Sequence, residues 1–298
     1  MQLFAGGGHS GLLTEGGRLY LWGWNIDGQC GPDMDINEEG PLPMIQSLSD
    51  LTIETAALGF SHTLVIEKAT CVVFAFGSNE RGQVTGTASS AGSTKKATPT
   101  TPLFLSNTKA IAVAAGLFHS AVITEEGELV MFGCDQFGQS LSKSDGEMAG
   151  RWSPSDGARL VAIACGRRHT ITADDRGRIW TMGENKYGQL GRSTGGDKFD
   201  ATPTLVEGIP LPSKYRKITL DCGWSHNVLL VETVDGENVV YGWGRNDKGQ
   251  LGLGTRENTP SPTLLFANKQ VATVACGSEC TMVVDKEGRV WGCGWNEQ

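Results

Sequence analysis

The residues best suited to chemistry are five histidines, and each one ends the same four-residue phrase, Gly-x-x-His. They are His9, His62, His119, His169 and His226. A serine adjoins four of them, and a serine beside a histidine is the core of a nucleophile–base pair. A catalytic pair occurs once and needs a third group that orients the base, whereas this histidine recurs along the chain. We therefore predict a structural role for it, in hydrogen bonds to backbone groups between neighbouring strands or repeats.

The same residues do not predict a metal or nucleotide site. Zinc ligands converge within about 2.0–2.3 Å of one point, whereas histidines that recur once per repeat should stand too far apart. The chain has no C-x-x-C pair and no phosphate-binding loop of the G-x-x-x-x-G-K-(S/T) type. Cys165, Cys222 and Cys276 occupy a small apolar position before the repeat glycine, which suits reduced structural thiols. We expect no metal, no cofactor and no enzymatic activity.

The spacing of the phrase indicates a repeat protein. Successive copies begin 53, 57, 50, 57 and 54 residues apart, and the sixth copy ends in Cys280. Each copy continues with a β-rich run, a turn, and a second run that ends in an apolar residue and Gly, followed by Gly-x-Asn or Gly-x-Asp. Glycines of the turns, such as Gly16 and Gly127, are predicted to supply the positive φ of a tight hairpin; the second copy has Lys68-Ala69-Thr70 instead. Three or four short strands per copy, repeated radially, predict a β-propeller.

The composite pattern resembles the repeat of the regulator of chromosome condensation family. It reads Gly-x-x-His-(Ser/Thr), a Gly turn, then aromatic-Gly-x-Asn-x-x-Gly-Gln-Leu-Gly, and Cys165 to Gly191 matches it nearly in full. The resemblance covers residues 1–298 and implies an all-β fold, a single propeller domain. Propellers of that family usually have seven blades, whereas six repeats are visible and the last stops at Trp295-Asn296-Glu297-Gln298, before its expected Gly-Gln. Six blades or seven are both compatible; a truncated seven-bladed protein is favoured, because an unclosed sheet edge invites aggregation.

The order of strands predicts which loops share a face of the propeller. The Gly-x-x-His turn joins the first two strands and the Gly-x-Asn loop follows the third, so both lie at one end of an antiparallel meander. Their variable residues are rich in aromatic residues and arginine, which are typical of interface hot spots. We predict partner contacts at Trp24, Phe60, Phe118, Arg167, Arg168, Trp224, Arg245 and Trp295. The alternative is that several of these side chains plug the central channel.

Charge and hydropathy narrow the kind of partner. The net charge is −8, and 25 Lys and Arg residues are spread over 298 positions, which argues against direct binding of nucleic acid. No signal peptide and no apolar run of membrane-spanning length is visible. We expect a monomer in the cytoplasm, the nucleus or both, with a protein partner and no membrane contact.

The resemblance leaves several functions open. The favoured one is a non-catalytic platform that binds a partner protein; the alternative is a guanine-nucleotide exchange factor for a small Ras-like GTPase. The exchanger of that family wedges a loop into its GTPase, but neither insertion of this chain, Thr87 to Pro102 or Gly191 to Pro203, aligns with that wedge. The stretch from Trp22 to Gly31 is similar to one repeat of secretion-regulating exchange-factor-like propellers and of accessory propellers in diphthamide and tRNA modification, the second alternative. Light sensing, as in the plant ultraviolet-B photoreceptor of the family, is not expected, because Trp224 is the one tryptophan inside a Gly-x-x-His phrase.

Overall fold

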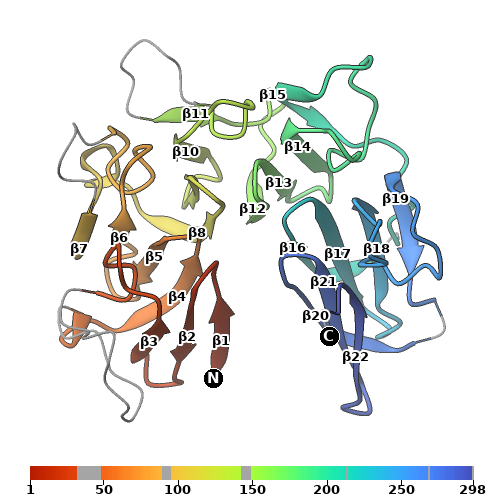
Figure 1. Cartoon of the computed structure of the whole chain (residues 1–298), viewed down its shortest axis with the longest axis horizontal. Coiled ribbons are helices and arrows are strands. Elements are labelled where there is room, and N and C mark those ends of the chain that lie inside the picture. The colour runs from red at the N-terminus through yellow and green to blue at the C-terminus, as the bar shows by residue number, and fades with distance from the viewer. Residues whose placement is uncertain (32–47, 89–94, 142–148, 213, 268, 297–298) are drawn as a thin grey trace. The chain divides into compact units, whose positions relative to one another are not determined.

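Each repeat of the chain folds into an antiparallel meander of short strands (Figure 1). The computed structural model describes residues 1–31, 48–88, 95–141, 149–212, 214–267 and 269–296. The strands of the first three sheets are β1 (Gln2–Ala5), β2 (His9–Leu13) and β3 (Leu19–Gly23); β4 (Ile53–Leu58), β5 (His62–Glu67), β6 (Val73–Ser78) and β7 (Lys95–Thr100); and β8 (Ala110–Ala115), β9 (His119–Thr124), β10 (Leu129–Gly133) and β11 (Gly150–Trp152). A short 3-10 helix, η2 (Leu103–Leu105), precedes β8.

The last three sheets repeat this plan. Their strands are β12 (Leu160–Cys165), β13 (His169–Asp174), β14 (Ile179–Glu184) and β15 (Phe199–Leu205); β16 (Tyr215–Cys222), β17 (His226–Thr233), β18 (Val239–Gly244) and β19 (Thr259–Leu265); and β20 (Val271–Cys276), β21 (Cys280–Asp285) and β22 (Val290–Gly294). The prediction of an all-β propeller is confirmed, with six blades in the part of the chain that the structure describes. Whether the propeller has six or seven blades stays a prediction. No helix in these residues is long and apolar enough to span a membrane.

The chain divides into two compact units. Unit 1 comprises residues 1–136 and 140–161, and unit 2 comprises residues 137–139 and 162–298. Unit 1 contains the first three blades; unit 2 contains the last three, except that β12 begins within unit 1. The assignment of residues 1–298 to a single domain stays a prediction.

The middle strand of each blade shows how blades pack within a unit. All six residues of β5, β9 and β13 are buried, and so are all but one of the eight residues of β17, so both faces of these strands are covered. In β2 and β21, by contrast, buried positions alternate with more exposed ones, as expected for a sheet with one covered face. Separate apolar clusters fill the spaces between successive blades, with Leu21 and Phe76 in one and Ile171 and Trp243 in another.

Recurring polar residues connect one blade to the next. Nε2 of His9 lies 2.8 Å from Oγ1 of Thr63 in the next blade, and this hydroxyl donates to the carbonyl of Gln29 in the first blade (2.8 Å). Because the single hydroxyl proton is used on Gln29, Nε2 of His9 must carry the proton of its own bond. His62 and Ser120 repeat this arrangement at 2.9 Å, and Ser120 donates to the carbonyl of Gln83 (2.7 Å).

Unit 2 has the same connection with an amide in place of a hydroxyl. Nε2 of His169 donates to Oδ1 of Asn227 (2.8 Å), and the amide nitrogen of Asn227 donates to the carbonyl of Gln189 (2.7 Å). His226 lies 3.1 Å from Oγ1 of Thr281. All five histidines are buried. These bonds support the structural role predicted for the histidines, which stays a prediction until variants are measured.

The hairpin turns follow the expected positions with two differences. Gly127, Gly177, Gly236 and Gly288 have φ between 79° and 84°. The assignment of the first turn to Gly16 is wrong: Gly17 has the positive φ of 75° and donates its N–H to the carbonyl of Thr14. In the second blade, which lacks the glycine, Cys71 takes φ 59°, and the Glu67 carboxylate accepts hydrogen bonds from Ala69 and Thr70. A side chain thus supports a turn that glycine supports elsewhere.

Removal of one connecting hydroxyl tests how much these bonds stabilise the fold. Thr63→Val keeps the volume but leaves Nε2–H of His9 and the carbonyl of Gln29 without a partner in a buried site. We expect the free energy of unfolding to fall by about 1–3 kcal/mol in urea titrations. Thr202→Val, at an exposed position of β15, is the matched control and should change it by less than about 0.5 kcal/mol. Equal stability of the two variants would contradict this role.

Acid should destabilise the protein. Burial lowers the pKa of His9, His169 and His226 from 6.5 to about 4 and that of His62 to about 3. The unfolded chain therefore binds protons first, and the free energy of unfolding should fall as the pH drops from 6.5 towards 4. Asp221 should increase stability as the pH falls, because burial raises its pKa to about 6, but this one group opposes four histidines. Urea titrations at pH 7.5, 6.0 and 5.0 measure the slope, which should be shallower for His169→Gln; a flat profile would refute the mechanism.

Candidate functional site

Two recurring side chains hold the shape of each Gly-x-Asn loop. Oδ1 of Asn25 accepts the N–H of Cys30 (2.8 Å), and Oε1 of Gln29 accepts the N–H of Asp27 (3.0 Å). The same two bonds recur in four other loops. The side-chain oxygens of Asn79, Asp135, Asn185 and Asn246 accept the backbone N–H of Val84, Ser140, Leu190 and Leu251, respectively. Those of Gln83, Gln139, Gln189 and Gln250 accept the backbone N–H of Arg81, Phe137, Tyr187 and Lys248. The residues between Asn and Gly-Gln therefore extend from a loop of fixed shape.

In unit 1 the predicted residues form an aromatic patch, made of Trp24, Phe60 and Phe118. Trp24 is 64% exposed, and the rings of Phe60 and Phe118 are 6.4 Å apart in an edge-on contact. The glycine run explains how the first two lie so close to the backbone. A Cβ on Gly7 would stand 2.5 Å from the ring of Phe60, and one on Gly8 would stand 2.7 Å from the ring of Trp24. The run makes space for two aromatic rings, and no nucleotide-binding role is needed to explain it.

In unit 2 the predicted residues form stacks of cations on aromatic rings. The guanidinium of Arg167 lies 5.0 Å from the ring centre of Trp224, which is 37% exposed. Arg168 lies 4.4 Å from the ring centre of Phe137 and 3.7 Å from a carboxylate oxygen of Glu184. Such stacking fixes the plane of a guanidinium while its N–H groups stay available at the edge.

The other two predicted residues lie in similar stacks. Arg245 lies 5.0 Å from the ring centre of Tyr187 and is ion-paired with Asp247 (2.8 Å) and Glu279. Trp295 is 53% exposed, with the ammonium of Lys248 6.0 Å from its ring centre. The structure thus groups the eight predicted residues into separate clusters in the two units. The choice between partner contact and a plug of the channel stays a prediction.

Four residues of these stacks were missed by sequence reasoning. Phe137, Lys186, Tyr187 and Lys248 lie between the Asn or Asp and the Gly-Gln of their repeats. The signal was present, because these two positions differ from copy to copy as much as the Gly-x-x-His positions do. Aromatic residues at these positions serve as platforms for arginines that lie far away in the sequence.

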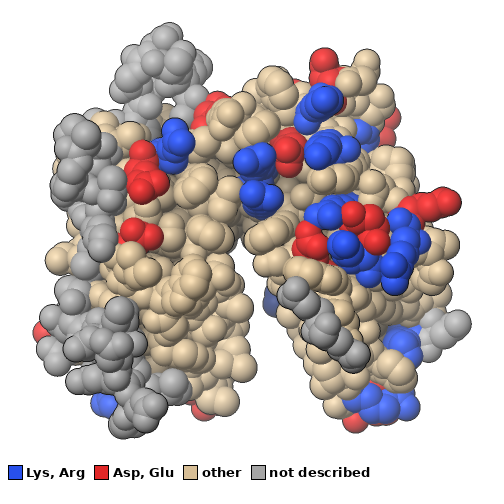
Figure 2. All heavy atoms as spheres, in the orientation of Figure 1, with Lys and Arg blue, Asp and Glu red and all other residues tan. Residues whose placement is uncertain are grey.

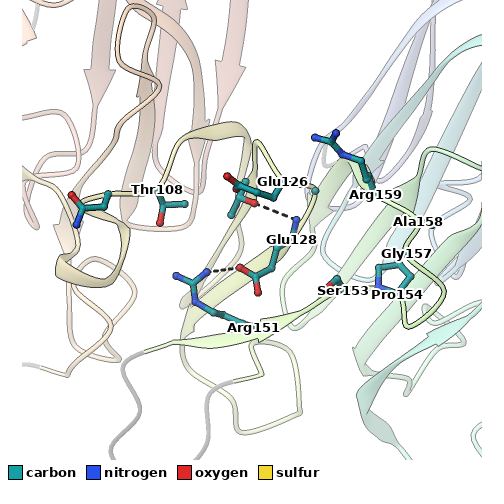
Figure 3. A pocket seen from close by; sticks show the side chains of 12 residues that line it. Thr108, Glu126, Glu128, Arg151, Ser153, Pro154, Gly157, Ala158 and Arg159 are labelled. Carbon is teal, nitrogen blue, oxygen red and sulfur yellow. Dashed lines mark hydrogen bonds and ion pairs between the residues drawn. The ribbon is translucent and has the colours of Figure 1, made fainter.

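A pocket of about 520 Å³ lies at the hairpin of β9 and β10 in unit 1 (Figure 3). In this view Glu126 and Glu128 lie between Arg151 and Arg159, and all four side chains line the pocket. Glu128 is ion-paired with Arg151, and Arg159 donates to the carbonyl of Glu125. These charges balance one another, so the pocket offers no converging set of groups for a reaction. No group of three His, Cys, Asp or Glu is placed to hold a metal ion in the described part of the chain.

Comparison with known proteins identifies the family. The sequence model of the RCC1-like domain matches residues 1–298. The chain belongs to the RCC1-like domain family. Among relatives, the chain is 32% identical to the ultraviolet-B receptor UVR8 of Arabidopsis thaliana, over 100% of this chain and 66% of the receptor. It is 28% identical to the secretion-regulating guanine nucleotide exchange factor of Bos taurus, over 99% of this chain and 66% of that protein.

Solved structures agree on the fold. Yeast RCC1 (Prp20), in its complex with Kap60, superimposes with a TM-score of 0.80 at 21% identity, over 99% of this chain and 69% of that chain. The repeat pattern of the regulator of chromosome condensation family thus predicted the family correctly, and the chain has an RCC1-like fold. The chain spans slightly less than two thirds of the length of the curated relatives named above.

The glycine run provides a test of the aromatic patch. In Gly8→Ala the new methyl group would overlap the ring of Trp24, so the ring must move. We expect a shift of the Trp24 indole N–H resonance in a ¹H–¹⁵N spectrum, assigned with Trp24→Phe. Gly16→Ala is the control, because the nearest atom to its Cβ, Oγ1 of Thr14, is 3.9 Å away. An unchanged Trp24 resonance in Gly8→Ala would show that the ring does not lie on this glycine.

Proposed function

We propose that this RCC1-like propeller is a non-catalytic platform that binds a partner protein through its Gly-x-x-His and Gly-x-Asn loops. One observation carries the proposal: the residues that recur in these loops are buried, whereas large residues that differ between copies are exposed. His62 and Gln83 are inaccessible, but Trp24, Trp224 and Trp295 expose a third or more of their surface. Exposed aromatic rings on loops of fixed shape have the composition of an interaction hot spot.

The absence of catalysis in this proposal follows from where the histidines lie. His9 and His169 are buried, and each donates its Nε2 proton to a neighbouring blade. A buried histidine engaged in this way cannot reach a substrate as a general base. The eight cysteines are all free thiols, and burial raises the pKa of Cys30 and Cys165 to about 12, which makes them poor nucleophiles at neutral pH.

The second candidate is a guanine-nucleotide exchange factor for a small Ras-like GTPase. Two relationships favour it. The chain is 28% identical to a secretion-regulating guanine nucleotide exchange factor, and a solved structure of its fold, Prp20p, is described with binding to Gsp1p and histones. An exchange factor also works through a binding face without catalytic groups, by stabilising the nucleotide-free GTPase. A role as accessory subunit in diphthamide or tRNA modification stays a prediction, as do the monomeric state, the lack of nucleic-acid binding and the cytoplasmic or nuclear location.

Affinity capture from the native cell, with quantitative mass spectrometry, tests the platform. We expect at least one protein to be captured by the unmodified chain and lost with Trp224→Ala or Arg167→Ala, because these remove a hot-spot pair. Arg216→Gln, an exposed arginine of β16 that donates to the carbonyl of Val234, is the matched control and should keep every partner. If both face variants kept every partner, the assignment of this face would be wrong.

Release of labelled GDP from a panel of Ras-like GTPases separates the two candidates. The platform predicts no acceleration of release by the purified chain. Acceleration by orders of magnitude, lost in Trp224→Ala, would establish the exchange factor instead.

A further inference from the structure

The charge of the protein is distributed unequally between the two units. By sequence, unit 1 has 9 Lys and Arg against 17 Asp and Glu, and unit 2 has 16 of each. The whole net charge of −8 therefore belongs to unit 1. In the view of Figure 2, charged residues of both signs gather over the blades drawn from green to blue in Figure 1, and the surface of the first three blades has few.

The Gly-x-x-His and Gly-x-Asn loops have the same asymmetry. In unit 1 these loops contain one basic residue, Arg81, whereas in unit 2 they contain five. These are Arg167, Arg168, Lys186, Arg245 and Lys248. An anionic ligand would therefore be attracted to the loops of unit 2 and not to those of unit 1.

Not all of these cations are neutralised within the protein. Arg168 is paired with Glu184, and Arg245 with Asp247 and Glu279. Within the described ranges, no carboxylate lies within ion-pair distance of the other three, which we call the open cations: Arg167, Lys186 and Lys248. Each of the three lies over an aromatic ring instead, at 4.9–6.0 Å from its centre.

Arg167 is the most unusual of the open cations. Its side chain is half-buried, and its Nε has no hydrogen-bond partner and no contact with solvent. Its Nε–H is therefore a buried donor that the folded protein leaves unsatisfied, which costs free energy. The guanidinium lies over the ring of Trp224, and this contact limits its motion and lowers the entropy cost of ordering it on binding. A carboxylate that accepts two parallel N–H bonds matches this geometry.

A hollow next to these loops provides room for a peptide. It has a volume of about 530 Å³ and is lined by Lys186 and Lys198, with Ser193 and Thr194 as hydrogen-bonding groups. Arg192 in its wall is neutralised by Asp200 at 2.9 Å, and Asp197 is the acidic residue of the lining. Lys186 belongs both to the open cations and to this hollow.

We propose that the loops of unit 2 bind an acidic segment of a partner protein, with a carboxylate held by Arg167 on Trp224 and further carboxylates at Lys186 and Lys248. The inference rests on the platform function proposed above and names the chemistry of its partner. A short acidic peptide fits better than nucleic acid. The open cations number three, and Glu184, Asp247 and Glu279 of the same loops would repel a continuous phosphate backbone.

Fluorescence anisotropy with a rhodamine-labelled hexaglutamate peptide tests the proposal at 50 and 150 mM salt. We expect saturable binding that weakens with salt, while the uncharged hexaglutamine peptide does not bind. Arg167→Gln should raise Kd about tenfold or more, since it removes a charge-assisted hydrogen bond. Arg167→Lys keeps the charge but not the planar guanidinium, so its Kd should lie between those of the unmodified protein and Arg167→Gln. Arg216→Gln, the same charge change away from these loops, should leave Kd within about twofold.

Two lysine variants test the proposal independently, in case Arg167→Gln does not fold. Lys186→Gln and Lys248→Gln change exposed or half-exposed side chains, and each should raise Kd about threefold. Thermal melting of every variant checks the fold. No binding of hexaglutamate, equal Kd for Arg167→Gln and Arg216→Gln, or tighter binding of a phosphoserine peptide or single-stranded DNA would overturn the proposal.

The two proposals can fail separately. Failure of hexaglutamate to bind, with partners still lost in Trp224→Ala, would refute the acidic chemistry and leave the platform intact. Binding of hexaglutamate through Arg167, with native partners unaffected by either face variant, would refute the platform face and leave the anion site.

Discussion

One buried interaction recurs between the blades of both units, the bond from a neutral histidine ring to a polar side chain of the next blade. The receiving group, Thr63 or Asn227 for example, donates in turn to a backbone carbonyl of the blade that carries the histidine. The links of His9, His62 and His169 therefore contain two bonds that cross between blades in opposite directions. The second ring nitrogen, Nδ1, is buried without a partner, so a proton on it would have no acceptor. Burial and this missing acceptor both favour the neutral ring, and the connection is complete only while the ring stays neutral.

This constraint separates the residues of each loop into two classes. Histidine, asparagine and glutamine are used up by bonds within the fold, and their positions tolerate little change because each buried polar group needs its partner. The side chains of the residues between them do not make these framework bonds. In unit 1 they include Trp24 and Phe60, whose rings lie on glycines. In unit 2 they are cationic and stacked on aromatic rings. One framework therefore presents two kinds of surface chemistry.

Proteins related to this chain include a light receptor and a guanine nucleotide exchange factor, so the fold alone does not determine function. The distinguishing information lies in the variable loop positions. Open cations are the informative ones, because a charge already paired within the protein contributes little to a partner, whereas an unpaired charge that is half-buried costs stability until a ligand compensates it. Arg167 and Arg245 illustrate the contrast: both are stacked on aromatic rings, but Arg245 has two carboxylates and Arg167 has none among the described residues.

The sequence alone determined the repeat and the two strands that follow each Gly-x-x-His, because these follow from local periodicity. It did not locate the fourth strand of a blade: β7 lies inside the insertion Thr87 to Pro102, and β15 begins inside the insertion Gly191 to Pro203. It predicted Gly16 instead of Gly17 in the first turn, since either glycine satisfies the local pattern and the position of the flanking strands decides. It did not show that Glu67 supports a turn without glycine, that the rings of Phe137 and Tyr187 lie under arginines, or that Gly7 and Gly8 make room for two rings. Those facts arise from contacts between loops of different copies, many of them about fifty residues apart. A periodic pattern says which positions correspond, but only the packed tertiary structure decides which distant side chains meet and which charges remain unpaired.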